Sequence, residues 1–302
     1  RTLLRALLWF YRALPLQRWL RRSRVLGHGG LARLESLLPA STDGCGSQDL
    51  SEPETTAATS IAMFRGCVSD VLERDSIAAA ERLLRAAGYA IQSAPAQTCC
   101  GALHQHAGMP AQARALARNN VAAFADCERV ASVTTGCAAT LRDYVEMDVE
   151  GGAALARSVR DFADWLLPKA DQLKFRPLPL RAALHTPCTA LNVMKSDIAL
   201  RELLGRIPQL ELLDLDSTQR CCGAAGTHFI TQPEAADRLL APKLDAVQRL
   251  KPDLIISANI GCSLHISGGL TRLAAAGAAP GPAVRHPAQV LAEQLVWPPL
   301  RS

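Results

Sequence analysis

The chain has 302 residues, a formal net charge of +5, and 49% apolar against 20% charged residues. This composition is typical of a globular protein, and the length allows two domains with separate cores. No apolar run approaches the roughly 20 residues that span a bilayer, and the mild charge gives no case for nucleic-acid binding. We therefore expect a cytoplasmic protein that does not cross a membrane.

The first 57 residues differ from the rest of the chain. Leucines at helical spacing alternate with arginines until Pro15, and a second short helix is predicted over Leu16–Arg24. A stretch rich in Gly, Ser, Thr and Asp then indicates a linker. We interpret residues 1–57 as a basic helical segment and linker that docks on its own domain or on a partner subunit. There are two alternatives for this segment: it contacts the inner face of the cytoplasmic membrane, or it is a transit-like peptide.

From residue 58, short apolar strands alternate with amphipathic helices, and the same order begins again after about residue 170. The predicted strands are Ile61–Phe64, Tyr89–Gln92, Ala131–Thr134, Ala182–His185, Glu211–Leu213 and Leu254–Ser257. The predicted helices are Ser76–Ala87, Gln112–Ala125, Asp197–Leu204 and Glu234–Leu250. This alternation predicts an α/β fold with short, mainly parallel sheets. We expect two tandem domains, 58–170 and 171–302, related by a pseudo-twofold axis.

Eight of the ten cysteines mark this repeat. In each half a single cysteine is followed by a Cys-Cys-Gly sequence and then by a Gly-Cys pair. The two sets are Cys67, Cys99, Cys100 and Cys137, and Cys188, Cys221, Cys222 and Cys262. Cys45 and Cys127 lie outside the repeat, and for them we favour ordinary packing as small apolar side chains.

Adjacent cysteines are poor disulfide partners, because neighbouring Cα atoms lie about 3.8 Å apart whereas a disulfide prefers roughly 4.4–6.8 Å. Four thiolates that converge on one point instead suit zinc or an iron–sulfur cluster. The eight cysteines are therefore candidate metal ligands, four in each half. Gly101 and Gly223 follow the pairs, where a tight backbone turn needs freedom in φ.

The two Cys…Cys-Cys-Gly…Cys units resemble the cysteine-rich CCG domain of the glycolate oxidase iron–sulfur subunit. Lactate-utilisation protein A and the corresponding subunit of heterodisulfide reductase share this domain, and the resemblance covers about residues 58–290. The sequences at 221–227 (Cys-Cys-Gly-Ala-Ala-Gly-Thr) and 259–265 (Asn-Ile-Gly-Cys-Ser-Leu-His) are similar to the second unit of the glycolate oxidase subunit.

The resemblance implies a 4Fe–4S cluster in at least one unit, with preference for the second, and leaves zinc open for the other. It also implies that electrons pass from a flavin-containing subunit, which oxidises a 2-hydroxy acid, towards a quinone or another acceptor. Two departures stand out. Thr140 and His265 occupy the positions of the fifth cysteines of heterodisulfide reductase, and the chain has no Cys-x-x-Cys-x-x-Cys ferredoxin motif. Because it begins at Arg1, we expect a fragment or a truncated relative, with the ferredoxin clusters on lost sequence or on another, ferredoxin-type subunit.

Three histidines near the cysteines are candidates for tuning a metal centre through hydrogen bonds: His265, His104 and His228. His265 is also an alternative ligand, whereas ordinary loop positions explain the other two equally well. His185, three residues before Cys188, is a weaker candidate. Two other functions remain open: a zinc-stabilised scaffold, and a thiol–disulfide enzyme that uses the adjacent cysteines.

Overall fold

The computed structural model describes residues 30–38, 59–216, 218 and 220–296. The two helices expected within residues 1–24, most of the predicted linker, and Cys45 lie outside the described residues. Just before the linker the structure has a short helix, α3 (Gly30–Ser36), that the sequence did not predict.

Two four-stranded sheets form the framework of the protein. Every pairing between their strands is parallel, and the strand orders are β2-β1-β3-β4 and β6-β5-β7-β8. The first sheet contains β1 (Thr59–Phe64), β2 (Tyr89–Gln92), β3 (Val130–Ser132) and β4 (Val159–Asp161). The second contains β5 (Arg181–His185), β6 (Glu211–Asp214), β7 (Leu254–Ser257) and β8 (Ala283–Arg285). The expected α/β fold with two repeated units is confirmed.

Helices connect the strands in the same order in both halves. Those of the first half are α4 (Ser69–Leu72), α5 (Arg74–Ala86), α6 (Ala102–His106), α7 (Pro110–Ala123), α8 (Thr135–Arg142), α9 (Gly152–Ser158) and α10 (Phe162–Leu166). Those of the second half are α11 (Asp197–Gly205), α12 (His228–Thr231), α13 (Pro233–Leu250), α14 (Ile260–Ala275) and α15 (Pro287–Gln294). One turn of π-helix, Ala190–Met194, follows Cys188.

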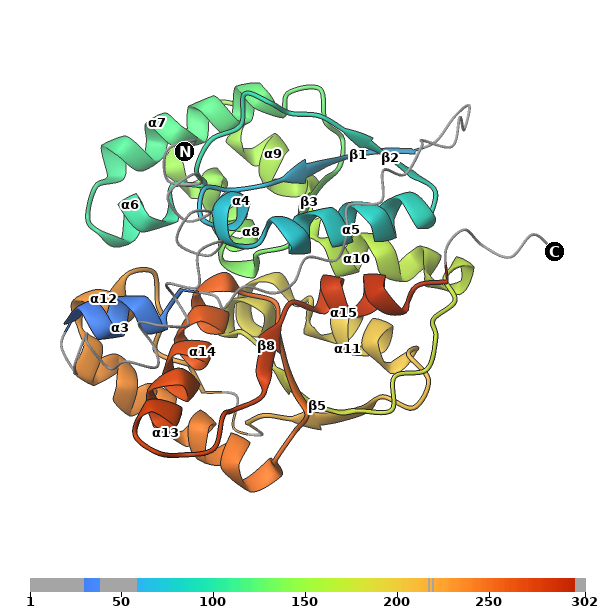
Figure 1. Ribbon diagram of the computed structural model, residues 1–302. Coiled ribbons are helices and arrows are strands. Elements are labelled where there is room, and N and C mark those ends of the chain that lie inside the picture. The colour runs from blue at the N-terminus through green and yellow to red at the C-terminus, as the bar shows by residue number, and fades with distance from the viewer. Residues whose placement is uncertain (1–29, 39–58, 217, 219, 297–302) are drawn as a thin grey trace, which may run out of the picture.

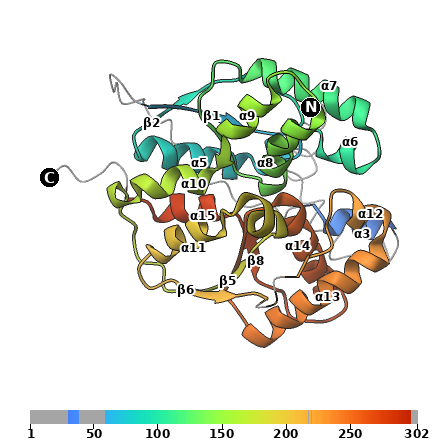
Figure 2. The ribbon, with the colours of Figure 1, turned by 180° about the vertical axis from the view of Figure 1, so that it is seen from behind.

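The largest core cluster lies between the two sheets. Alternate residues of a strand face opposite sides, so Ile61 and Met63 of β1 enter this core whereas Ala62 and Phe64 face the other way. Helices α5, α10, α11 and α15 fill the space between the sheets (Figure 1). Helices α7 and α9 cover the outer side of the first sheet, and α13 and α14 that of the second (Figure 2). The shared central core joins both halves into one packed body.

Most of the predicted elements were placed within two residues of their observed ends, but the last strand of each sheet was missed. Both β4 and β8 have three residues of which one is an arginine, so neither stands out as an apolar run in the way that the equally short but fully buried β3 does. Each leads directly into a helix whose first turn is capped by a side chain. Asp161 accepts a hydrogen bond from the Ala163 N–H at 3.0 Å, and His286 accepts one from the Ala288 N–H at 3.1 Å.

Candidate metal centres

Both cysteine sets lie at the carboxyl ends of the strands. The two central strands are β1 and β3 in the first sheet and β5 and β7 in the second. In each sheet the chain leaves one of them towards one edge of the sheet and the other towards the opposite edge. Side chains that follow these two strands converge at the point where the strand order reverses, which is the usual place for a ligand in an open parallel sheet. Cys67 and Cys188 follow β1 and β5, and Cys137 and Cys262 lie in the first turns of α8 and α14.

The structure brings the first cysteine set together. The Sγ atoms of Cys67 and Cys99 are 3.3 Å apart, and the Gly101 N–H points at the Cys99 sulfur at 3.5 Å. The thiol of Cys100 interacts with those of both Cys99 and Cys137. Four sulfurs from three separate segments thus form one continuous cluster.

The second set repeats this arrangement. Cys221 interacts with Cys188 and Cys222, and Cys222 also interacts with Cys262. The Gly223 N–H donates to the Cys221 sulfur at 3.3 Å, as the Gly101 N–H does to Cys99. The equivalence of the two Cys-Cys-Gly segments therefore extends from the sequence to the hydrogen bonds.

Close packing of the thiols lowers the pKa of some of them and raises the pKa of others. The pKa of Cys99 is lowered to about 2 because Cys100, and next Cys67, donate hydrogen bonds to its sulfur. The pKa of Cys221 is likewise lowered to about 2, by Cys188 and then Cys222. The thiols that donate have raised pKa values, since ionising them would break these bonds and place like charges side by side. A cationic centre removes this conflict, because it binds all the sulfurs as thiolates.

The glycines after the cysteine pairs adopt the left-handed conformation that the sequence led us to expect. Gly101 has φ of +92° and Gly223 has φ of +86°. A Cβ on Gly223 would lie 2.6 Å from the Ala236 carbonyl oxygen, whereas one on Gly101 would lie 3.3 Å from that of Ala113. The backbone after each cysteine pair therefore packs directly on the second helix that follows it, α7 in the first half and α13 in the second.

The three candidate histidines occupy different surroundings. His265 is buried, and its Nδ1–H donates to the Cys222 carbonyl oxygen at 2.9 Å while Nε2 lies 3.3 Å from Asp237 Oδ1. Its ring nitrogens are thus engaged with oxygen atoms. His228 Nδ1 lies 3.1 Å from the Gly223 carbonyl oxygen. His104 makes a small contribution to the lowered pKa of Cys99.

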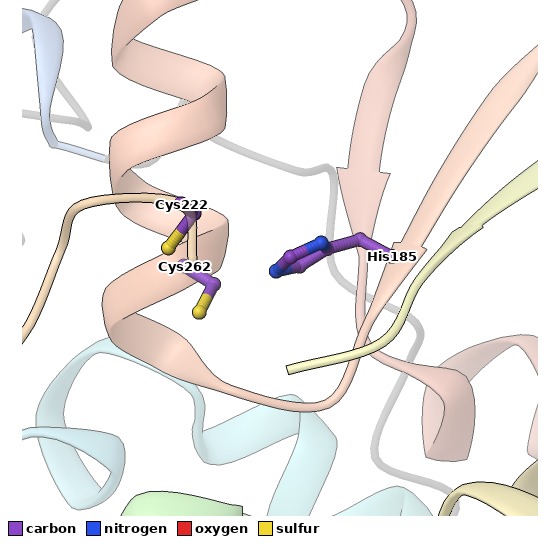
Figure 3. Close-up of side chains that lie close together, drawn as sticks. All are labelled: His185, Cys222 and Cys262. Atoms are coloured by element: carbon purple, nitrogen blue, oxygen red, sulfur yellow. The ribbon is translucent and has the colours of Figure 1, made fainter. Parts of the chain in front are cut away.

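The histidine that faces sulfur is His185, which the sequence ranked lowest. A ring nitrogen of His185 and the Sγ atoms of Cys222 and Cys262 all lie within 4.8 Å of one another. Figure 3 shows the imidazole pointing from the end of β5 towards the two sulfurs. The pKa of Cys262 is lowered to about 5, chiefly by Cys222 and further by His185. The one signal in the sequence was its place at the buried end of a strand just before Cys188.

Helix α3 closes one side of the second set. Leu37, directly after the helix, packs with Cys222 and Cys262 in a small apolar cluster. Arg33 of α3 forms a 2.6 Å ion pair with Asp237, the same carboxylate that contacts His265. A chain of polar contacts thus runs from the Cys222 carbonyl through His265 and Asp237 to Arg33 of α3, a helix far away in the sequence.

Buried titratable side chains from other elements also surround the second set. Lys243, on α13, is 1% exposed, forms a 3.1 Å ion pair with Asp216 and helps to lower the pKa of Cys221. Glu73 comes from the first half of the chain, and burial raises its pKa to about 8, with a smaller contribution from Cys262. The second set therefore lies where the two halves meet.

The fold and these two thiol clusters define a class of protein: a tandem α/β protein with one cluster of four cysteine thiols at the strand ends of each sheet. Comparison with known proteins gives the family. The cysteine-rich domain family, CCG, matches residues 61–142 and 182–267, together more than half of the chain. The chain belongs to this family.

Several known proteins are similar to most of this chain. It is 33% identical over 228 residues to the probable glycolate oxidase iron–sulfur subunit of Bacillus subtilis, covering 70% of this chain and 50% of that protein. It is 30% identical over 219 residues to the glycolate oxidase iron–sulfur subunit of Escherichia coli, covering 68% and 53%. Lactate utilization protein A of Geobacillus kaustophilus is 27% identical over 220 residues, covering 70% and 92%. The chain spans about half the length of the first two relatives.

Among the described residues, no helix combines the length and the apolar character needed to cross a membrane.

Proposed function

We propose that this chain binds iron–sulfur centres at its two cysteine sets and transfers electrons as a subunit of an oxidoreductase. The observation that supports this most directly is the convergence of four cysteine sulfurs in each half. The chemistry of the donors fits, since soft thiolates in an apolar setting, with backbone N–H groups pointing at sulfur, are the usual surroundings of such clusters. The iron–sulfur relatives agree with this assignment.

In this proposal the first centre is held by Cys67, Cys99, Cys100 and Cys137, and the second by Cys188, Cys221, Cys222 and Cys262. When bound, the clusters supply reversible one-electron redox chemistry. The protein's own contribution is to hold the sulfurs together, exclude water and set the local charge. In the second site, Gly223 N–H and Lys243 favour negative charge on Cys221, whereas Glu73 is buried close to Cys262.

We further propose that each centre is a 4Fe–4S cluster or, in one of the two sites, zinc. The electrons would come from a flavin-containing dehydrogenase subunit that oxidises a 2-hydroxy acid, and would continue to a quinone or a similar acceptor. Support comes from the similarity to the glycolate oxidase and lactate utilization proteins. Ferredoxin-type clusters would be supplied by another polypeptide segment or subunit, since the present sequence has no such motif.

The test is to purify the protein without oxygen and to measure its visible spectrum together with iron, sulfide and zinc per chain. A brown protein that contains iron and acid-labile sulfide is the expected result. A colourless protein with about two zinc ions per chain would overturn the redox function in favour of a structural scaffold. A metal-free protein with reactive thiols would instead favour thiol–disulfide chemistry.

A further inference from the structure

The two repeats carry different residues at the buried position three residues before the first cysteine of each set. Phe64 ends β1 three residues before Cys67, and His185 ends β5 three residues before Cys188. Both side chains are almost fully buried, at 1% and 2% exposure. Phe64 packs among apolar residues in the outer core of the first half. The second half therefore has an imidazole where the first has a phenyl ring.

The imidazole of His185 has an unused nitrogen. Its Nε2 is buried and has no hydrogen-bond partner among the described residues. Leaving such a group unpaired is costly, so buried polar atoms without a partner call for an explanation. The nearest polar groups are the Cys222 and Cys262 sulfurs, which lie with a ring nitrogen of His185 inside 4.8 Å, and His185 acts directly on the Cys262 thiol.

A metal ion accounts for this geometry. Tetrahedral ligands at metal–sulfur and metal–nitrogen distances of about 2.3 and 2.0 Å lie about 3.5–3.8 Å from one another. The observed limit of 4.8 Å allows that spacing after small side-chain movements. Imidazole nitrogen and cysteine sulfur are both common ligands of zinc and iron, so the three side chains suit one metal centre.

We propose that His185 binds the metal of the second centre through Nε2. That centre then has five protein donors, namely Cys188, Cys221, Cys222, Cys262 and His185, whereas the first centre has four cysteines. This inference rests on the proposed function, since it concerns the same metal site. The fifth ligand is therefore His185 and not His265, which the sequence offered as an alternative ligand. The nitrogens of His265 contact the Cys222 carbonyl oxygen and Asp237 instead.

The test uses protein labelled with ¹⁵N-histidine and pulsed electron paramagnetic resonance in whichever redox state is paramagnetic. We expect a strong ¹⁵N coupling in the wild type that is lost in His185→Phe, the residue of the first repeat, and in His185→Cys. His106→Gln is the matched control, because this histidine is exposed and we place it outside both centres. His185→Cys should retain the iron of the wild type, since a thiolate replaces the nitrogen donor.

Three results would overturn the assignment. They are the absence of a histidine coupling in an iron-containing wild type, its persistence in His185→Phe or His185→Cys, or a coupling weak enough to reflect only an N–H···S hydrogen bond. If His185→Phe does not fold, His185→Cys decides the matter. A wild type without iron and sulfide would contradict the proposed function instead. If it contains zinc, loss of a nitrogen ligand from the zinc X-ray absorption spectrum of His185→Cys tests His185 separately.

Discussion

Asn259 of the second repeat donates a hydrogen bond from Nδ2 to Thr135 Oγ1 of the first repeat, at 3.1 Å. The same side chain caps α14, because its Oδ1 accepts a hydrogen bond from the Gly261 N–H at 3.0 Å. Thr135 begins α8, so the helices that bear Cys137 and Cys262 start against one another. One amide side chain therefore fixes the helix of one cysteine set relative to that of the other.

Replacing Asn259 with Ala should destabilise the protein by about 2 kcal/mol. Loss of an N-cap costs about 1 kcal/mol, and loss of a hydrogen bond between the halves costs about 1 more. Asn259→Asp is the matched variant, because it retains the capping oxygen but not the Nδ2 donor, and it should lose roughly half as much. Urea unfolding of the metal-loaded proteins measures both changes. Equal stability of Asn259→Ala and the wild type would show that this contact contributes nothing.

The two cysteine sets should lose their metal independently. Cys222→Ser removes a ligand at the centre of the second set and should strip that centre of its metal, while the first centre keeps its own. Cys100→Ser should do the same to the first set. Because the two variants affect different clusters, their visible and paramagnetic spectra should add up to that of the wild type. Iron and sulfide per chain, measured after anaerobic purification, provide the readout.

Cys127→Ala is the control for these two variants. Cys127 packs in the outer core of the first half, and burial raises its pKa, which is typical of a structural thiol. The variant should lose some stability through the small cavity that it creates, but no iron. Wild-type iron content in Cys222→Ser, or iron loss in Cys127→Ala, would refute the assignment of the ligands.

The two Cys-Cys-Gly turns should tolerate an added methyl group to different extents. Gly101→Ala and Gly223→Ala both place alanine at positive φ, which costs about 1–2 kcal/mol. At Gly223 the new Cβ would also lie 2.6 Å from the Ala236 carbonyl oxygen, so the backbone must move. We expect Gly223→Ala to be clearly less stable than Gly101→Ala in thermal unfolding, and to lose iron from the second centre first.

Gly205→Ala serves as the comparison for these variants. Gly205 ends α11, has no positive φ, and has nothing within 4 Å of an added Cβ. Alanine there should leave the stability unchanged or raise it by about 0.5 kcal/mol. If Gly223→Ala behaved like Gly205→Ala, the tight packing of the second turn on α13 would not exist in solution.

Sequence patterns predicted the parts of the fold that depend on local periodicity. The bounds of β2 (Tyr89–Gln92) and β7 (Leu254–Ser257) match the prediction because each is a short apolar run between turn residues. The two cysteine sets were grouped correctly in sequence because both the Cys-Cys-Gly sequence and the final Gly-Cys pair recur. That grouping required no knowledge of the packing.

The surroundings of the second set could not be predicted in the same way. His265 follows Cys262 by one helical turn, which favoured it as a donor, but its orientation depends on Asp237 from α13 and on the Cys222 carbonyl. His185 had no motif of its own. Its role emerges only when β5, the loop before α12 and the start of α14 are brought together. Contacts between distant segments, rather than local preference, decide which histidine faces sulfur.

The caps of α10 and α15 should have opposite pH responses. Asp161 and His286 occupy equivalent positions before these helices. Burial raises the pKa of Asp161 from 3.8 to about 8, so its contribution to stability is present at low pH and is lost as the pH rises towards 8. Burial lowers the pKa of His286 from 6.5 to about 4, so its contribution is present above 6.5 and is lost as the pH falls.

Between pH 4 and 6.5 these two responses oppose each other, whereas between 6.5 and 8 the Asp161 response acts without that of His286. Asp161→Asn keeps an oxygen for the Ala163 N–H but cannot ionise. Its stability relative to the wild type should therefore rise by about 1 kcal/mol per pH unit on average over this range, with the slope decreasing towards pH 8. Glu73, whose pKa is also raised to about 8, remains in both proteins and cancels in the comparison. Urea unfolding at about pH 6.5, 7.25 and 8 measures the difference, and parallel curves for the two proteins would mean that Asp161 is already ionised in the folded state.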